Sequence, residues 1–283
     1  MKIAFLGLGR MGRELVRHLL ESDRHDLILW NRTATAAEEF AATGAQLAAT
    51  PVQAVQGAEA VITCLFGPDA VREVILDLTP PLAEKTLWID ISTVGPDFAQ
   101  FCADWADDHD LDYVNAPVLG SLAPARAGDL GVLIGGRSAS ARARTRAIVA
   151  CWADPERIVE FDRAASAATG KLVVNYGLAV GMQALIEAVR VGEAGGLNRA
   201  EALNLLRLPK TPLSVIAGMK GTLLESGDYS ATQFSANLLA KDADLMLGLV
   251  AGQATPALTA AFAALEHVRR AGHGEEDFAA MAG

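Results

Sequence analysis

The chain has 283 residues, of which 51% are hydrophobic and 20% are charged, so it can hold one large domain or two ordinary domains with a substantial core. A net charge of −10 and the lack of a polybasic run argue against nucleic acid and membrane surfaces as partners. We find no apolar stretch of the roughly 20 residues that span a bilayer, and the N-terminus enters a strand rather than a signal peptide. These features predict a cytoplasmic protein.

The three cysteines, Cys64, Cys102 and Cys151, are odd in number and widely spaced, with no C-x-x-C pair. We expect them to be buried thiols in a reducing compartment. No metal site is expected.

The first predicted strand, Lys2 to Leu6, runs into a glycine-rich turn. The turn fits the pattern G-x-G-x-x-G with the residues Gly7, Leu8, Gly9, Arg10, Met11 and Gly12. In this pattern the first Gly allows a tight turn, the second lets the backbone approach a pyrophosphate, and the third lets a helix pack on the sheet. The helix that follows directs its positive end at the turn, which favours phosphate binding. A purely structural turn is the alternative.

A second apolar strand, Leu27 to Trp30, ends about 20 residues after the glycine pattern, where this fold contacts the adenosine ribose. The residues at that point are Asn31, Arg32 and Thr33, whereas an NAD site usually places an acidic residue there. An Arg can pair with a 2′-phosphate, so we predict NADP rather than NAD. The alternative is that Thr33 caps the next helix and Arg32 lies in solvent.

Strands and helices continue to alternate up to about residue 163, which predicts a doubly wound parallel sheet covered on both faces. The further strands are expected at residues 60–65, 87–91, 113–121, 128–136 and 157–161, and helices begin near Pro68, Pro96 and Ser138. Ser92 and Thr93 lie at the carboxyl end of a strand, where open α/β sheets bind ligands. Alternatively, they cap the helix at Pro96.

The remaining residues, 164–283, show only helical patterns. We predict a long helix over residues 165–194 that joins two domains, 1–163 and 164–283. Further helices are predicted at residues 199–206, 212–219, 234–250 and 256–271. The last dozen residues are expected to be frayed or loosely packed.

The long helix carries the best candidate for proton transfer, Lys171, with Asn175 one turn away on the same face. Lys171 could exchange a proton with a substrate oxygen that Asn175 also binds. A solvated surface lysine is the alternative, but its neighbours are apolar or small. Downstream, Phe234 and Lys241 lie on a predicted helix, where the functional interpretation directs Lys241 at the nicotinamide and the alternative is a charged helix edge.

Taken together, these motifs make the chain resemble the β-hydroxyacid dehydrogenase family over nearly its whole length. The resemblance rests on GLGRMG at 7–12, DISTV at 90–94, NAPVLGS at 115–121, the run from Gly170 to Asn175, and FSANLLAKD at 234–242. It implies a Rossmann-type domain followed by an all-α domain, an active site between them, and a homodimer or homotetramer.

The resemblance also implies roles for single residues. Lys171 corresponds to the catalytic lysine and Asn175 to a substrate-binding asparagine. Leu65, Thr93, Phe234 and Lys241 are assigned to the cofactor together with residues 7–12 and 31–33. Ser92, Leu119, Gly120 and Ser121 are assigned to the substrate. The family commonly reads D-A-P-V-S-G, whereas this chain has Asn115 and Leu119, so the usual carboxylate contact is altered.

The leading hypothesis is an NADPH-dependent reductase that converts a small aldehyde or keto acid into a hydroxy acid. The Asn-Arg-Thr run resembles the glyoxylate and succinic semialdehyde reductases of the family. The alternatives are an imine reductase of the same fold, which typically lacks the lysine, and a catalytically silent dinucleotide-binding protein, for which we would expect basic extensions.

Overall fold

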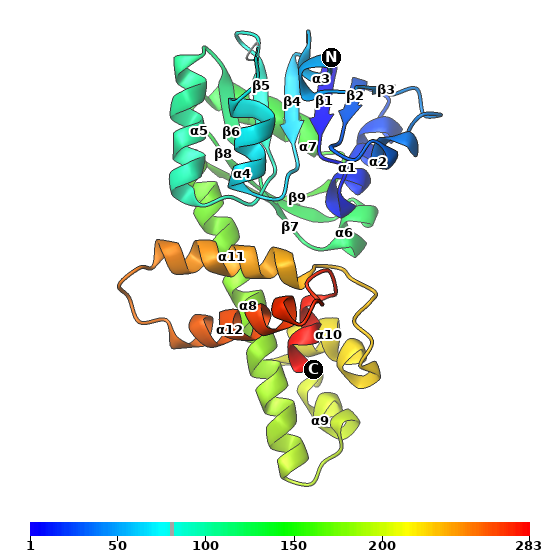
Figure 1. Cartoon of the computed structure of the whole chain (residues 1–283), viewed down its shortest axis with the longest axis vertical. Coiled ribbons are helices and arrows are strands. Elements are labelled where there is room, and N and C mark those ends of the chain that lie inside the picture. The colour runs from blue at the N-terminus through cyan, green and yellow to red at the C-terminus, as the bar shows by residue number, and fades with distance from the viewer. Residues whose placement is uncertain (80–81) are drawn as a thin grey trace. The chain divides into compact units, whose positions relative to one another are not determined.

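The computed structural model describes residues 1–79 and 82–283, and the chain divides into two units, Met1–Lys171 and Leu172–Gly283. The first unit is built on a sheet and the second consists of helices (Figure 1). This confirms the predicted fold class, an α/β sheet domain followed by an all-α domain. The division lies inside the long helix, and the domain boundary at residue 163 stays a prediction.

Within the described residues the first unit has a nine-stranded sheet in the order β3-β2-β1-β4-β5-β6-β8-β7, with β9 beside β8. The strands are β1 (Lys2–Leu6), β2 (Asp26–Trp30), β3 (Gln46–Leu47), β4 (Ala60–Thr63), β5 (Leu87–Asp90), β6 (Asp112–Asn115), β7 (Val118–Leu119), β8 (Leu130–Gly135) and β9 (Ala153–Phe161). Strands β1 to β6 pair in parallel, whereas β8 is antiparallel to β6 and β7. The order reverses at β1, where ligands bind in sheets of this kind.

Helices cover both faces of the sheet because its strands alternate their apolar side chains between two cores. Phe5 packs in one core with Leu15 and Ile148, whereas Leu6 packs in the other with Val71 and Ala99. The helices of this unit are α1 (Arg10–Glu21), α2 (Thr35–Glu38), α3 (Pro51–Val55), α4 (Pro68–Val71), the π-helix η1 (Arg72–Leu76), α5 (Pro96–Asp108), α6 (Leu122–Ala127) and α7 (Ala139–Val149). The sequence did not predict the short elements β3, α3 and α6. The predicted strand at 60–65 extends two residues beyond β4, and β9 begins four residues before the predicted strand at 157–161.

The second unit begins inside α8 (Ala164–Ala194), whose first residues belong to the first unit. This helix matches the predicted long helix. The later elements are α9 (Arg199–Leu206), α10 (Ser214–Ser226), α11 (Ala236–Leu249), α12 (Pro256–Arg270) and the 3-10 helix η2 (Phe278–Ala282). Their apolar faces form one core, in which Leu185, Leu239 and Leu265 are fully buried. Helix α10 extends seven residues beyond the predicted end at 219 and ends at Gly227, its C-cap, which has a left-handed φ of +69°.

The prediction of a frayed C-terminal segment is wrong. Phe278 is 1% exposed, and the preceding Asp277 is fully buried in an ion pair with Lys220, whose Nζ lies 2.8 Å from the carboxylate. The Asp277 amide donates to the Tyr229 carbonyl and the Phe278 amide to the Phe234 carbonyl, each at 3.0 Å. These long-range contacts hold the C-terminal segment in the core.

Helix α8 contradicts the expectation that no stretch of the chain could span a bilayer. Helix α8 is long and apolar enough to do so by length and composition alone. However, Leu185, Ile186 and Val189 of this helix are buried in the core of the helical unit. A buried core helix of a folded protein can be equally long and apolar, so length and composition alone do not indicate a membrane span.

Candidate active site

The glycine-rich turn after β1 has the shape that a dinucleotide requires. Gly7 has a φ of +108°, and a side chain there would collide with the Cys64 carbonyl. A side chain on Gly12 would collide with the Gly7 carbonyl, so this glycine lets α1 press on the turn. At Gly9, by contrast, an added Cβ would meet no heavy atom within 4 Å. The turn therefore packs tightly on the protein side and leaves space beside Gly9, which fits the close approach of a pyrophosphate.

Helix α1 starts directly at this turn with Gly9 as its N-cap, and no side chain caps it. The N–H groups of its first turn are thus directed at the space beside the turn, as in other phosphate sites. Arg10 is exposed and Met11 half-buried at the same helix end. The residues present fit a pyrophosphate.

Asn31, at the end of β2, connects the turn to the predicted ribose site. Its Oδ1 accepts the Leu8 amide N–H at 2.9 Å, and its Nδ2 donates to the Thr33 carbonyl at 2.9 Å. Arg32 is exposed beside it. The alternative in which Thr33 caps the next helix is wrong, because α2 begins at Thr35 with Ala34 as its N-cap. Asn31 therefore shapes this edge and leaves the Arg32 guanidinium at the surface.

The ends of β4 and β5 are joined by Ser92, whose Oγ accepts the Leu65 amide N–H at 2.9 Å. Thr93 is half-buried next to it. Ser92 and Thr93 do not cap α5, whose N-cap is Gly95, so that alternative is wrong as well. The Ser92 amide donates to Asp90 at 3.0 Å, which brings a carboxylate into this region that sequence analysis did not single out. Burial raises the pKa of Asp90 to about 6.

Lys171 is held against the sheet by the first turns of α8. Gly135 and Gly170 permit this packing, because a Cβ on Gly170 would lie 3.0 Å from Leu133 and one on Gly135 would lie 2.7 Å from Ala167. The Lys171 Nζ donates to the carbonyl of Val118, in β7, at 2.9 Å. The side chain is half-buried, so the alternative of a fully solvated lysine is wrong.

The segment after Val118 is the predicted substrate loop. Leu119 is half-buried opposite Gly131 in β8. Gly120 has a φ of +135°, and a Cβ there would lie 2.7 Å from Leu130, so only glycine fits. Ser121 is the N-cap of α6 but makes no side-chain cap. The structure therefore brings Lys171 and the loop 119–121 together through Val118.

Asn115, the other departure from the family pattern, lies at the end of β6 and is fully buried. Its Nδ2 donates to the Asp90 main-chain carbonyl at 3.2 Å. The amide thus belongs to the contacts that join β5 and β6.

In the helical unit, Asn175 is 2% exposed and donates its Nδ2 to Asp242 Oδ2 at 2.5 Å. Asp242 Oδ1 lies 2.7 Å from Lys241 Nζ, which forms an ion pair. Asn175, Lys241 and Asp242 therefore form one cluster. Phe234 precedes α11 instead of lying on it, since Ser235 is the N-cap and accepts the Leu238 amide N–H. The sequence signal for Asp242 was its place beside Lys241.

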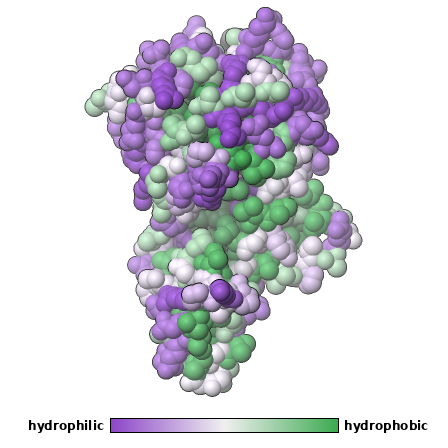
Figure 2. Space-filling view, turned by 180° about the vertical axis from the view of Figure 1, so that it is seen from behind, coloured by the Kyte–Doolittle hydropathy of each residue, from purple (hydrophilic) through white to green (hydrophobic). Residues whose placement is uncertain are grey.

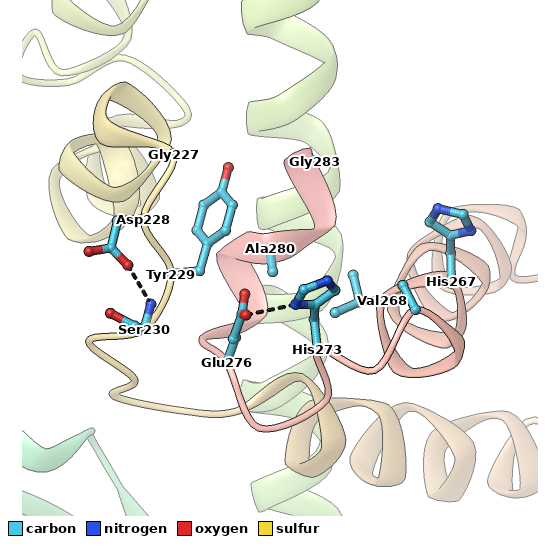
Figure 3. Close-up of a pocket in the computed structure, with 11 residues that line it drawn as sticks. Gly227, Asp228, Tyr229, Ser230, His267, Val268, His273, Glu276, Ala280 and Gly283 are labelled. Carbon is cyan, nitrogen blue, oxygen red and sulfur yellow. Dashed lines mark hydrogen bonds and ion pairs between the residues drawn. The ribbon is translucent and has the colours of Figure 1, made fainter.

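A cavity of about 450 Å³ also lies in the helical unit (Figure 3). It is lined by Gly227, Asp228, Tyr229, Ser230, His267, Val268, Ala271, His273, Glu276, Ala280 and Gly283. None of the predicted site residues lines it. The His273 Nδ1 lies 2.7 Å from the Glu276 carboxylate, and the Asp228 carboxylate accepts the Ser230 main-chain N–H at 2.9 Å, so these three polar side chains have partners within their own loops.

Two family profiles together match nearly the whole chain. Residues 2–161 match the NAD binding domain of 6-phosphogluconate dehydrogenase. Residues 165–283 match the profile described as "NAD-binding of NADP-dependent 3-hydroxyisobutyrate dehydrogenase".

Single relatives are similar over their full length. The NAD-dependent L-serine dehydrogenase of Pseudomonas aeruginosa is 31% identical, with 99% of this chain and 96% of that protein covered. Glyoxylate/succinic semialdehyde reductase 1 of Arabidopsis thaliana is 28% identical, with 99% and 97% covered. The solved 3-hydroxyisobutyrate dehydrogenase of Mycobacterium tuberculosis with L-serine has a TM-score of 0.86 at 28% identity, with 99% and 97% covered.

Other proteins are similar at a lower identity, or over only part of their own length. The imine reductase from Pseudomonas sp. shares the fold, with a TM-score of 0.66 at 20% identity and 99% and 97% covered. The chain spans about half the length of the cytokine-like nuclear factors N-PAC of insects, and 46% of the one from Drosophila melanogaster, at 24% identity.

Proposed function

The chain belongs to the β-hydroxyacid dehydrogenase family of NAD(P)-dependent oxidoreductases, and from that premise we propose that it reduces a small aldehyde or keto acid to a hydroxy acid with NADPH. The observation that carries this proposal is the position of Lys171, whose amine is held at Val118, directly before the predicted substrate loop. Reduction of C=O requires a proton donor at the substrate oxygen, and an ammonium group beside the loop that holds the substrate can supply it.

The cofactor would be held by residues 7–12 at its pyrophosphate and by residues 31–33 at its adenosine ribose. When bound, it supplies the hydride. Leu65, Thr93, Phe234 and Lys241 are proposed to contact the rest of the cofactor. The space beside Gly9 and the uncapped start of α1 support the first assignment.

Lys171 is proposed to donate a proton to the substrate oxygen during reduction and to accept it in the reverse reaction. Its hydrogen bond to the Val118 carbonyl fixes the direction of the amine. Asn175 is proposed to bind the same oxygen, because it lies one turn further along α8. Asp242 already accepts one Asn175 N–H, which orients the amide.

The substrate carboxylate is proposed to bind at Gly120 and Ser121, with Ser92 as a further contact. Leu119 supplies an apolar side chain where the family commonly has serine. A substrate with a larger or less polar substituent than a hydroxymethyl group would suit this position, because an apolar side chain offers no hydrogen bond to a substrate hydroxyl. The substrate class is therefore a semialdehyde or keto acid with an alkyl chain.

NADP is proposed over NAD because Arg32 is exposed at the ribose edge and no acidic side chain occupies residues 31–33. A guanidinium pairs with a 2′-phosphate, whereas an acid would bind a 2′-hydroxyl. The similar L-serine dehydrogenase of Pseudomonas aeruginosa is named as NAD-dependent, so the preference must be measured for this chain.

The test is oxidation of NADPH and of NADH against a panel that contains glyoxylate, succinic semialdehyde, longer keto acids, tartronate semialdehyde and cyclic imines. We expect turnover of at least one carbonyl substrate and a kcat/KM at least tenfold higher with NADPH. Turnover of imines alone would favour the alternative of an imine reductase. Dinucleotide binding without turnover of any compound would favour a catalytically silent protein.

We also propose a cytoplasmic homodimer or homotetramer. The helical unit exposes apolar side chains on α8 and α10, among them Val173 at 66%, Val191 at 74% and Val215 at 76%. Figure 2 shows hydrophobic residues, in green, on the surface of this unit. Such faces are commonly covered by a second subunit. Light scattering should give a mass of at least two chains, and Val215→Asp should lower it, whereas a monomeric wild type would contradict the proposal.

A further inference from the structure

Side chains from three neighbouring strands meet at one buried carboxylate, that of Asp90, at the end of β5. The side chain is 0% exposed. Its Oδ1 accepts the Thr63 hydroxyl at 2.8 Å and the Ser92 amide N–H at 3.0 Å, and its Oδ2 accepts the Tyr113 hydroxyl at 3.3 Å. Burying an anion among neutral donors costs free energy that a well-packed apolar side chain would not. This cost indicates that the buried carboxylate has a function other than stabilising the fold.

Asp90 is connected to the predicted cofactor site through two steps. It fixes the Ser92 main chain, and the Ser92 Oγ accepts the Leu65 amide N–H at 2.9 Å. The Leu65 segment in turn lies against Gly7 of the glycine-rich turn, since a Cβ on Gly7 would lie 3.0 Å from the Leu65 side chain and collide with the Cys64 carbonyl. One carboxylate thus supports two segments that border the turn.

We propose that Asp90 is a positioning residue for the dinucleotide, whose ionised carboxylate holds Ser92 and Leu65 in the arrangement that binds the cofactor. The inference rests on the proposed function, in which Leu65 and Thr93, the neighbour of Ser92, contact the cofactor. Protonation converts one oxygen of Asp90 into a donor and removes the negative charge from the other, so the hydrogen bonds that Ser92 and Thr63 donate to the carboxylate become weaker. The protonated protein therefore binds the dinucleotide less tightly.

Protonation of Asp90 falls in a pH range in which binding can be measured. Burial raises the pKa of Asp90 to about 6, although hydrogen bonds from Ser92, Thr63 and Tyr113 act in the opposite direction. The other titratable groups that face it are Tyr113 on β6, Cys64 after β4 and Cys102 on α5, and Arg72 on η1 acts on Cys102.

Burial raises the pKa of all three neutral neighbours, that of Cys64 to about 12, so the two thiols and the phenol stay neutral below about pH 8. Within this group of residues, Asp90 is therefore the group whose charge changes between about pH 5 and 8.

The experiment is a fluorescence titration of wild type, Asp90→Asn and the control Asp112→Asn with NADPH and with NADH from pH 5 to 8. Asp112 is the first residue of β6, whereas Asp90 pairs with Asn115 at the other end of that strand. The Asp112 carboxylate forms an ion pair with Arg144. NADH lacks the 2′-phosphate, whose own ionisation near pH 6 would otherwise contribute. For wild type and Asp112→Asn, Kd should rise about tenfold as the pH falls through about 6. For Asp90→Asn, the NADH Kd should be constant.

A second variant, Tyr113→Phe, keeps the ring and removes one donor to the carboxylate. Because that hydrogen bond lowers the Asp90 pKa, its loss should move the midpoint of the Kd profile to higher pH. Identical profiles for wild type and Asp90→Asn, or an unmoved midpoint in Tyr113→Phe, would overturn the inference while leaving the proposed function intact. A wild type that binds neither dinucleotide would overturn both.

Discussion

Asn175 and Asp242 form a hydrogen bond of 2.5 Å between two side chains that are 2% and 1% exposed. Removing one partner of a buried pair leaves the other without its hydrogen bond, which costs about 1 to 3 kcal/mol. Asn175→Ala should therefore lower the free energy of unfolding in urea by that amount. Gln183→Ala, at a half-buried residue of α8 whose side chain donates to Glu187 one turn away, is the control and should change it by less than about 0.5 kcal/mol. Equal stabilities of the two variants would contradict this account.

Arg32 is predicted to set the cofactor preference. Replacing it by Asp removes a charged partner of the 2′-phosphate, which is worth about 1.5 to 3 kcal/mol, or about 10- to 100-fold in kcat/KM for NADPH. The new carboxylate should at the same time improve the use of NADH. The control is Arg24→Asp, an exposed arginine before β2. An unchanged ratio of the two kcat/KM values in Arg32→Asp would show that Arg32 does not contact the cofactor.

Lys220 and Asp277 hold the C-terminal segment in the helical core. Each side chain is at most 3% exposed, and the Lys220 Nζ also lies 4.4 Å from the centre of the Phe278 ring. Lys220→Met should destabilise the protein by about 3 to 5 kcal/mol, because it leaves a buried carboxylate unpaired. The double variant Lys220→Met/Asp277→Leu should recover part of this loss.

The control for that experiment is Lys210→Met, which changes an exposed lysine. Thermal and urea unfolding measure all variants. If the double variant were as unstable as the sum of both single variants, the two charges would not act as a pair.

Asp90 should also make stability depend on pH. Its folded-state pKa of about 6 is higher than the ordinary value of 3.8, so the folded protein binds this proton more tightly than the unfolded chain. The contribution of this proton to the free energy of unfolding is fully present below about pH 4 and is lost as the pH rises through about 6. The total change in the free energy of unfolding is about 3 kcal/mol. The difference in unfolding free energy between wild type and Asp90→Asn should shrink by that amount from pH 4 to 7. A difference that stays constant would contradict the burial of a titrating carboxylate.

Local patterns were sufficient for the fold because the strands of the sheet are short apolar runs and α8 is a long apolar helix without proline. The glycine pattern identified the turn, since its glycines are required by clashes within neighbouring segments. The short helix α6 was missed because its six residues, with Pro124 inside, carry no helical period.

What the sequence could not predict depends on contacts between distant residues. Phe278 is buried because Asp277 pairs with Lys220, 57 positions away. Asp90 acquires its role from Thr63 and Tyr113, which neighbouring strands bring to it. In the local sequence Asp90 is only an acidic residue at the end of an apolar run.

The central claim is that Lys171 transfers the proton to and from the substrate oxygen, and the kcat of Lys171→Met with NADPH and the best carbonyl substrate tests it most directly. Loss of a general acid should lower kcat about 100- to 10,000-fold, while the Kd of NADPH and the unfolding midpoint change little. The control Lys85→Met, at an exposed lysine, should keep wild-type kcat. A folded Lys171→Met enzyme that binds NADPH and retains near-normal kcat would contradict the account.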